Sequence, residues 1–413
     1  MESGWYLEEQ QPIYLDYNAT TPLDSEVRKV IIEALDLWAN PSSNNPMAAK
    51  AKEAIEKARK QVADLMHVTP KEVIFTSGGT ECNSWVIHSA IESSGLAKPH
   101  IVATEIEHPA IQNPLKKLKE RGVIDITFCP VDKSKGYVLP ETIGAAITSE
   151  TCLVSVMLAN NESGVIQPIT EIADITRKMG DKFGRKILVH SDTTQAVGKM
   201  DINLDTLKID YATVAGHKFY GPRCGALILR SALTVPIHPM ILGCTQESGL
   251  RAGTENTPMI AGLGKACESA AENLVEKEKK LLEHRRHFED QLKAQLGDQV
   301  LINFDASPRL ANSSSVAFPK YAETSADLLA KCKSFYASTA AAGHSKEKKA
   351  SKILLASGVS EDVALRSVRF SIGRDTTKEE LDRVVKELKA MLFLSKNAGS
   401  LMGALGKGPV AGF

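Results

Sequence analysis

Residues 211–229 read Tyr-Ala-Thr-Val-Ala-Gly-His-Lys-Phe-Tyr-Gly-Pro-Arg-Cys-Gly-Ala-Leu-Ile-Leu, two short apolar runs that flank a polar segment with glycine and proline. Similar runs occur earlier in the chain, at residues 73–76, 101–104, 124–128, 153–157 and 187–190. None alternates strictly between apolar and polar residues, which is typical of strands buried on both faces. Because segments of helical period separate the runs, we expect an α/β fold with a sheet covered by helices.

The pattern changes after about residue 230, which predicts a second, smaller α+β domain. Residues 258–296 have the period of one long helix, and residues 314–318 and 368–372 have the composition of strands. Thr377 and Glu380 have the spacing of a capping box, so we expect a last helix to begin there and reach about residue 394. The predicted domains are 14–260, with segment 1–25 contributing to the small domain, then 261–395, and a Gly-rich flexible tail at 396–413.

Composition excludes several classes of protein. The 413 residues contain 50 basic and 50 acidic side chains, so net charge gives no attraction to nucleic acid or to anionic membranes. We find neither a membrane-spanning apolar run nor a secretory signal at the N-terminus. The seven cysteines include no CxxC pair, which argues against a disulfide framework or a zinc site and favours a reducing compartment, the cytoplasm.

Two residues that directly follow apolar runs have the chemistry of a pyridoxal phosphate site. Lys218 follows the run at 211–214, and burial of its amine would lower the pKa and suit it to imine formation. Asp192 follows the run at 187–190, and its carboxylate could keep a pyridinium nitrogen protonated. Each also has a plain alternative, because Lys218 could be a surface loop lysine and Asp192 could cap the next helix.

Further polar residues follow the other runs, at the strand ends where α/β folds bind ligands. Ser77-Gly-Gly-Thr80 precedes a helical pattern and is a candidate phosphate-binding turn, although two glycines alone are weak evidence. His108 could stack on a planar ring, or be a structural histidine, and Asn160 and Asn161 offer amide donors to a phenolate oxygen. Arg369 and Arg374 could grip a substrate carboxylate or form ordinary ion pairs.

These motifs together resemble the class V aminotransferase group of fold-type I pyridoxal phosphate enzymes, in the cysteine desulfurase and selenocysteine lyase branch. The resemblance is closest to animal-type selenocysteine lyases and spans residues 14 to about 394. The matching stretches include Tyr14-Leu-Asp-Tyr-Asn-Ala-Thr-Thr-Pro22, Phe75-Thr-Ser-Gly-Gly-Thr-Glu81, Ala159-Asn-Asn-Glu-Ser-Gly164, Gly216-His-Lys-Phe-Tyr-Gly-Pro-Arg223, Arg251-Ala-Gly-Thr-Glu-Asn256 and Arg369-Phe-Ser-Ile-Gly-Arg374. The resemblance implies a mainly parallel seven-stranded sheet and a homodimer with shared active sites.

The resemblance also implies a role for each matching residue. The catalytic residues are Lys218, which forms the imine, Asp192, which pairs with the pyridinium, and His108, which stacks on the ring. The other implied cofactor contacts are Asn161 and Gln195 at the phenolic oxygen, Gly79, Thr80 and His217 at the phosphate, and Thr254 at the phosphate of the neighbouring subunit. The implied substrate contacts are Arg369, for the carboxylate, and Asn18, Ala19 and Thr20, which line the pocket.

The sequence departs from this family at the loop that carries its mobile cysteine. Gly343 stands at the cysteine's place in the stretch Ala337-Ser-Thr-Ala-Ala-Ala-Gly-His-Ser345, so the nucleophile that takes up sulfur or selenium is absent there. Cys332 lies too early, in a predicted helix, to replace it. Cys244 lies in a loop that approaches the site in relatives, but a bystander thiol is the favoured reading.

We expect a selenocysteine lyase-type enzyme that acts on a β-substituted L-amino acid such as L-selenocysteine, releases a selenolate without a cysteine acceptor and gives alanine. A first alternative is a diverged pyridoxal phosphate enzyme that catalyses β-elimination, β-decarboxylation or transamination of another amino acid. A second alternative is a catalytically silent scaffold. The expected partners are a small amino-acid substrate and a second copy of the chain, and any acceptor protein is unknown.

Overall fold

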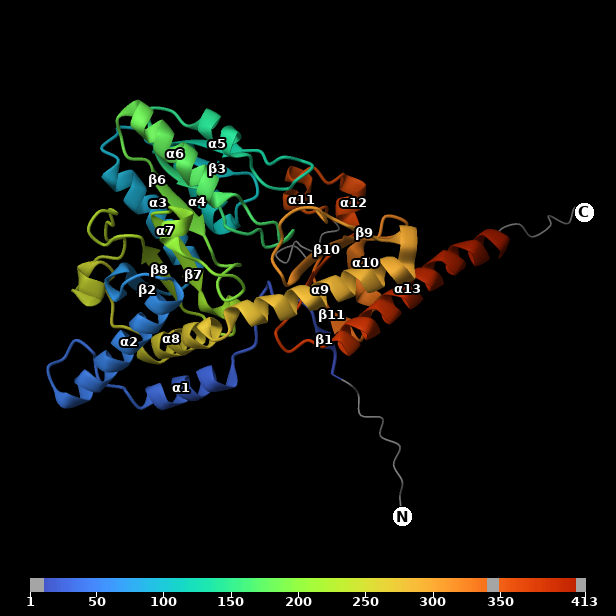
Figure 1. Cartoon of the computed structure of the whole chain (residues 1–413), viewed down its shortest axis with the longest axis horizontal. Helices are drawn as coiled ribbons and strands as arrows, with labels where there is room; N and C mark the ends of the chain where they lie inside the picture. Colours follow the sequence, from blue (N-terminus) through green and yellow to red (C-terminus); the bar gives the residue numbers. More distant parts are fainter. Residues whose placement is uncertain (1–10, 340–348, 406–413) are drawn as a thin grey trace, which may run out of the picture.

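The computed structural model describes residues 11–339 and 349–405 and has two lobes (Figure 1). The larger lobe contains a seven-stranded sheet of order β2-β8-β7-β6-β5-β3-β4, so the predicted α/β class and sheet are confirmed. Its strands are β2 (Val73–Thr76), β3 (His100–Thr104), β4 (Asp125–Cys129), β5 (Thr151–Ser155), β6 (Leu188–Asp192), β7 (Tyr211–Ala215) and β8 (Gly225–Leu229). Only β8 runs antiparallel to its neighbours, β2 and β7. No helix in the described ranges is long and apolar enough to span a bilayer.

Both faces of this sheet are covered by helices, as the unalternating strands predict. Along β2, Phe75 packs into one core with α2 and α8, whereas Ile74 packs into the opposite core with α3. The helices of this lobe are α1 (Ser25–Leu35), α2 (Pro46–Leu65), α3 (Gly79–Ser93), α4 (Pro109–Glu120), α5 (Pro140–Ala146), α6 (Ile169–Phe183), α7 (Leu204–Leu207) and α8 (Thr257–Ala271). The strands are therefore fixed from both sides, and their ends are fixed with them.

The parallel register of β6 and β7 brings two chemically important residues to one edge of the sheet. Asp192, the last residue of β6, lies opposite Thr213 of β7. The chain leaves β7 two residues later and forms the short 3-10 turn Gly216–Lys218. Because parallel strands present their carboxyl ends at the same edge, Asp192 and Lys218 are brought to the same end of the sheet.

The prediction of one helix over residues 258–296 is wrong, because the segment forms two helices, α8 and α9 (Leu274–Leu296). The break lies at Asn273, whose φ of 53° is in the left-handed region that asparagine tolerates better than most residues. The periodic pattern continues across the break and hides it. In space the break lets α8 pack on the large sheet beside α2 while α9 runs to the smaller lobe (Figure 1).

The smaller lobe is built around a three-stranded sheet of order β12-β10-β9. Its strands are β9 (Leu301–Ile302), β10 (Ser313–Ala317) and β12 (Ser367–Ser371), and its helices besides α9 are α10 (Ser325–Lys331), α11 (Lys352–Ala356), α12 (Glu361–Leu365) and α13 (Lys378–Leu405). The N-terminal strand β1 (Ile13–Tyr14) pairs in parallel with β11 (Phe335–Tyr336). Ile13 and Leu15 share a core with Phe288 and Phe370, so this early segment packs with the small lobe.

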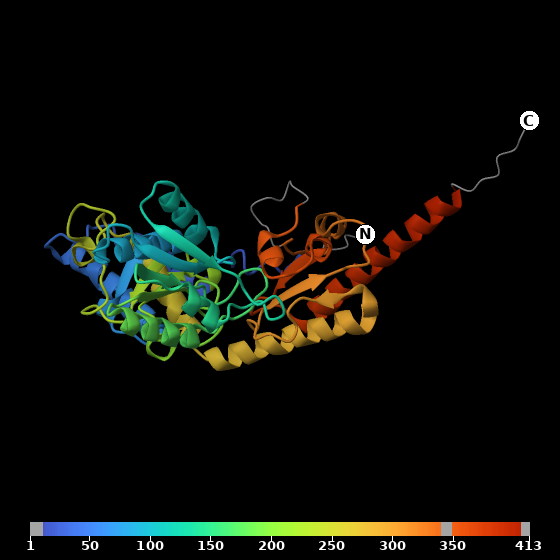
Figure 2. The same cartoon turned by 90° about the horizontal axis from the view of Figure 1, so that it is seen from above.

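The last helix begins as expected and ends later than expected. Thr377 donates its backbone amide to the Glu380 carboxylate at 2.9 Å, and Glu380 donates its amide to the Thr377 hydroxyl at 3.2 Å, as in a capping box. The expected end near residue 394 is wrong, since α13 continues to Leu405 and extends past the small lobe (Figure 2). Residues 398–405 include alanine, leucine and methionine, strong helix formers that offset Gly399 and Gly403. Of the predicted tail, residues 406–413 lie outside the described residues.

Gly264 on α8 offers a test of how closely α8 and α2 pack. A Cβ atom at this position would lie 2.5 Å from the Ala58 Cα and 2.6 Å from the Ala58 Cβ, and neither atom can move without the backbone of α2. We expect Gly264→Ala to lower the unfolding free energy by about 1–3 kcal/mol, although the same change in an open helix stabilises by about 1 kcal/mol. Urea unfolding midpoints measure the effect, with Lys265→Ala on the same helix as control. A higher midpoint for Gly264→Ala would contradict the packing described.

Candidate active site

Lys218 is held by two backbone carbonyls from the N-terminal segment. Its Nζ donates to the oxygens of Asn18 and Ala19, each at 2.8 Å, across about 200 positions of sequence. Burial, followed by the nearby Arg369 cation, lowers the lysine pKa from 10.5 to about 8, while Asp192 and Asp16 oppose this change. Lys218 is therefore an ordered, partly buried amine and not a solvated loop lysine.

Asp192 is buried at the end of β6 and accepts two hydrogen bonds. Asn83 Nδ2 donates at 2.8 Å, and the Thr194 amide donates at 3.0 Å. The Asp192 carboxylate only accepts and so requires the Asn83 nitrogen, which leaves the Asn83 oxygen to accept from the Thr213 hydroxyl at 2.7 Å. Asp192 does not cap a helix, since the residues that follow it form turns until α7 begins at Leu204.

A cavity of about 290 Å³ lies between these two groups. All of the predicted cofactor-contacting residues except Thr254 line it. The lining comprises Gly79, Thr80, Asn83, His108, Ala110, Met157, Ala159, Asn161, Asp192, Thr194, Gln195, Ala215, His217 and Lys218. The structure therefore gathers the predicted residues, which follow five different strands, into one cavity.

The N-terminus of α3 forms one end of this cavity. Gly79 and Thr80 open the helix, and Gly78 before them supplies no side-chain cap to the first amides. Uncapped amides at a helix N-terminus favour an anion such as a phosphate. Beside them, burial and the Lys218 cation lower the His217 pKa to about 4, so its imidazole is neutral and bonds Thr20 through Nδ1 at 3.1 Å.

His108 borders the cavity with its ring orientation fixed. It is the N-cap of α4, where its Nδ1 accepts the Ala110 amide at 3.1 Å, so its proton is assigned to Nε2 in the neutral ring. Burial lowers its pKa, which keeps the ring uncharged beside the cavity. The histidine thus has the structural role of a cap and is also placed to lie against a planar ligand.

Arg369 of β12 connects the small lobe to the cavity. Its Nη2 pairs with Asp16 at 2.6 Å and its Nη1 donates to the Asn161 carbonyl at 2.8 Å. Its Nε is buried and has no partner among the described residues. Arg374 instead pairs with Asp24 and lies 4.1 Å over the Tyr220 ring. Of the two roles considered for it from the sequence, it therefore has that of an ordinary ion pair.

The substrate-pocket residues predicted at 18–20 lie behind the cavity and do not line it. Asn18 is buried and supplies one of the carbonyls that hold Lys218, and Ala19 supplies the other. Thr20 contacts His217 through its hydroxyl. These residues act on the site through Lys218 and His217 in the structure described.

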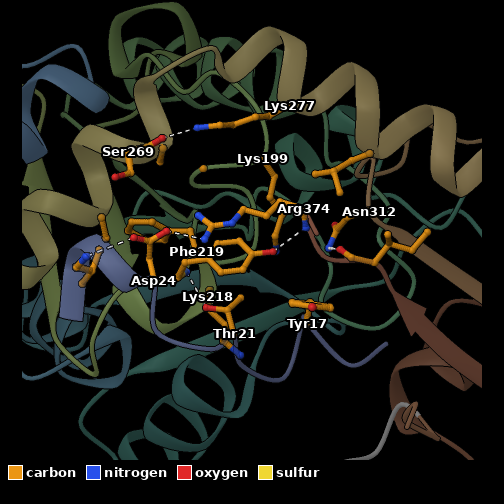
Figure 3. Close-up of a pocket in the computed structure, with 17 residues that line it drawn as sticks. Tyr17, Thr21, Asp24, Lys199, Lys218, Phe219, Ser269, Lys277, Asn312 and Arg374 are labelled. Atoms are coloured by element: carbon orange, nitrogen blue, oxygen red, sulfur yellow. Dashed lines mark hydrogen bonds and ion pairs between the residues drawn. The ribbon is translucent and has the colours of Figure 1, made fainter. Parts of the chain in front are cut away.

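Sequence reasoning missed several residues that shape the site. Asn83 lies one helical turn after Gly79, on the same face of α3. This spacing could have indicated from the sequence that Asn83 faces the same cavity as Gly79. Glu107 is buried; burial raises its pKa to about 8, and its Oε2 has no partner among the described residues. Lys199 is buried near Lys218, and both border a second, smaller cavity of about 50 Å³ (Figure 3).

Four positions considered in the sequence analysis are not part of this cavity in the described structure. Thr254 lines a separate cavity with Arg223 and Arg251, away from Lys218 of the same chain. Gly343 lies outside the described residues. Cys332 is buried, and burial raises its thiol pKa to about 12, whereas Cys244 is exposed.

The chemistry of these residues fits pyridoxal phosphate. The cavity has an amine at Lys218, a carboxylate at Asp192 and the uncapped end of α3. In addition, the Thr194 hydroxyl lines the cavity, is buried and has no partner among the described residues, which leaves it available to a polar ligand. Asp192 would hold the ring nitrogen, α3 the phosphate, and Lys218 the aldehyde carbon.

Comparisons with known proteins agree with this fit. The family profile described as aminotransferase class-V matches residues 13–384. The chain is 42% identical to the selenocysteine lyase of Bos taurus over 407 residues, which covers 92% of this chain and 93% of that protein. It is 38% identical to the cysteine desulfurase IscS of Methanosarcina thermophila, with 95% of each covered. A solved structure titled NifS-like protein superposes with a TM-score of 0.84 and 34% identity, over 93% of this chain and all of that one.

The match to the family profile spans most of the chain, and the relatives cover nearly its whole described length. The prediction of an enzyme, and of its cofactor, is confirmed, and the silent-scaffold alternative is not supported. The chain belongs to the aminotransferase class-V family of pyridoxal phosphate-dependent enzymes.

Proposed function

We propose that this enzyme is a lyase of the selenocysteine lyase and cysteine desulfurase type, acting on L-selenocysteine to give alanine without a nucleophilic cysteine at position 343. The observation that carries the proposal is the cavity between Lys218 and Asp192, with Arg369 beside it. The names of the relatives at 38–42% identity support the substrate class. Gly343 supports the departure from a cysteine-based transfer.

The residues of this chain divide the chemical work. When bound, pyridoxal phosphate supplies the electron sink that stabilises negative charge on the substrate Cα. Lys218, with a pKa of about 8, is able to give and take a proton near neutral pH. Arg369 is the candidate to bind a substrate carboxylate, because its guanidinium contacts Asn161, which lines the cavity, and is held in place by Asp16.

Formation of alanine from selenocysteine leaves selenium in the zero oxidation state, so an external thiol must accept it when the loop thiol is absent. Loss of hydrogen selenide by simple β-elimination would instead give pyruvate and ammonia. The weaker carbon–selenium bond favours the selenium substrate over cysteine when no enzyme nucleophile assists. The identity of the small product therefore separates the proposal from its main alternative.

We also propose that the enzyme is a cytoplasmic homodimer with shared active sites. Ile32, Leu35, Trp38 and Met47 are large apolar side chains exposed on or beside α1 and α2, where a second copy would cover them. Thr254 lies near Arg223 and Arg251 and outside its own chain's cofactor cavity, as a residue reaching a partner's site would. Seven free thiols, six of them buried, suit a reducing compartment.

A substrate panel tests the function directly. We expect the holoenzyme, with a small thiol present to accept the selenium, to convert selenocysteine to alanine much faster than cysteine, because the carbon–selenium bond is the weaker one. Aspartate and cysteine sulfinate, which lose CO2 or SO2 without any acceptor, represent the diverged alternative and should react more slowly than selenocysteine. Amino-acid analysis measures alanine, and a coupled assay measures pyruvate. Lys218→Ala should lower the rate by about 10²–10⁴-fold, while Lys208→Ala on the surface should not.

Pyruvate in place of alanine, or faster turnover of another substrate, would reject the proposal in favour of the diverged enzyme. Gly343→Cys is the companion variant. If the missing thiol limits the reaction, this variant gains cysteine desulfuration, and no gain would show that the pocket limits it.

The pH dependence of cofactor uptake tests the environment of Lys218. Only the neutral amine attacks an aldehyde, so the rate at which apo-protein takes up pyridoxal phosphate should rise with pH and level off above about 8, and not above 10.5 as for an ordinary lysine. Arg369→Met should move the midpoint to higher pH, because it removes a cation that lowers the lysine pKa. The matched control, Arg374→Met, should leave the midpoint unchanged, and a midpoint near 10.5 in the wild type would refute the assignment.

A further inference from the structure

Lys199 is a buried lysine that the proposed reaction does not use. Its side chain is within the protein interior, and no carboxylate of the described residues pairs with it. Its Nζ donates to the Gln195 carbonyl at 2.9 Å, to Gln195 Oε1 at 3.4 Å and to Asn18 Oδ1 at 3.5 Å. Burial of a cation among neutral acceptors is costly, which calls for a compensating role.

The contact with Gln195 fixes which end of that amide faces the cofactor cavity. An amide can flip, exchanging its oxygen and nitrogen, but an ammonium only donates and so requires the oxygen. With Oε1 toward Lys199, the Gln195 Nε2 donates to the Asn18 carbonyl at 3.0 Å. Nε2 makes no second hydrogen bond among the described residues, and Gln195 lines the cofactor cavity.

Asn18 is oriented in the same way. Its Oδ1 accepts from Lys199 and from Asn312 Nδ2 at 3.1 Å, so its own Nδ2 donates to Ser313 at 2.8 Å. Its backbone carbonyl, in turn, accepts from Lys218. Figure 3 shows Lys199, Lys218 and Asn312 around the smaller cavity, and Lys218 lines both this cavity and the cofactor cavity.

We propose that Lys199 is a positioning residue, whose ammonium locks the Gln195 amide so that an N–H donor faces the phenolic oxygen of the bound cofactor. The inference deepens the proposed function and rests on its cofactor alone, because no substrate enters the argument. Lys199 does not line the 290 Å³ cavity, so it acts through Gln195 and touches neither cofactor nor substrate. Burial, followed by the Lys218 and Arg369 cations, lowers the Lys199 pKa from 10.5 to about 7, so the ammonium that orients Gln195 is fully present only below that pH.

The test is a double-substitution cycle on the holoenzyme without substrate. The measured quantity is the pH at which the visible absorbance of the bound cofactor changes as the proton shared by the Lys218 nitrogen and the phenolic oxygen is lost. An N–H donor to that oxygen eases loss of the proton, so Lys199→Met should raise the midpoint by about 0.5–1 pH unit, the size of one hydrogen bond. Lys265→Met, a lysine paired with Glu268 outside the site, should not shift it.

The cycle uses Gln195→Leu as its second variant. If Lys199 acts through Gln195, the Lys199→Met shift disappears in the Gln195→Leu background. Equal shifts in both backgrounds, or no shift in Lys199→Met alone, would overturn the proposal.

Lys199→Gln keeps an N–H donor for Gln195 Oε1 and removes the charge, which guards against poor folding of Lys199→Met. We expect this variant to shift the midpoint by less than about 0.3 pH unit, because the amide stays oriented. A full shift would show that the charge acts directly on the cofactor and would overturn the positioning role. If selenocysteine is not converted to alanine in the substrate panel but the double-substitution cycle gives the expected shifts, the proposed function is rejected and the role of Lys199 stands.

Discussion

The hydrogen bonds from Lys218 Nζ to the carbonyls of Asn18 and Ala19 join the end of the large sheet to the N-terminal segment that packs with the small lobe. They hold the amine without a carboxylate partner, so burial is free to lower its pKa. The backbone N–H of Asn18 in turn donates to the Ser371 hydroxyl of β12. The reactive nitrogen is therefore positioned only when both lobes are folded.

The strand ends were predictable from sequence because a strand buried on both faces has a clear apolar signature. Asp192 and Lys218 could be placed together because β6 and β7 are parallel neighbours, which aligns their carboxyl ends. Asn83 and Lys199 could not be found in this way, since their roles depend on contacts with Asp192 and Gln195 that only the packed fold creates. The break between α8 and α9 at Asn273 was not predicted for a related reason. The helical period of the sequence continues through it, and only packing of α8 against the sheet requires the chain to change direction there.

The site combines neutral donors with few charges. Two lysines have lowered pKa values, two histidines that border or contact the cavity are neutral, and Asp192 is the carboxylate that lines the cavity. In such surroundings a single oriented N–H has a large effect, because the effective dielectric constant is low. Hydrogen bonds orient the amides of Asn83, Gln195 and Asn18 around the charged groups of the site.

Reduction of the holoenzyme with borohydride, followed by peptide mass mapping, identifies the amine that carries the cofactor. We expect a single pyridoxyl group on the peptide that contains Lys218, and loss of the label in Lys218→Ala. A label on Lys199 or on a surface lysine, or a reduced protein with no label, would contradict the claim that the cofactor is bound to Lys218 in the cavity that Asp192 lines.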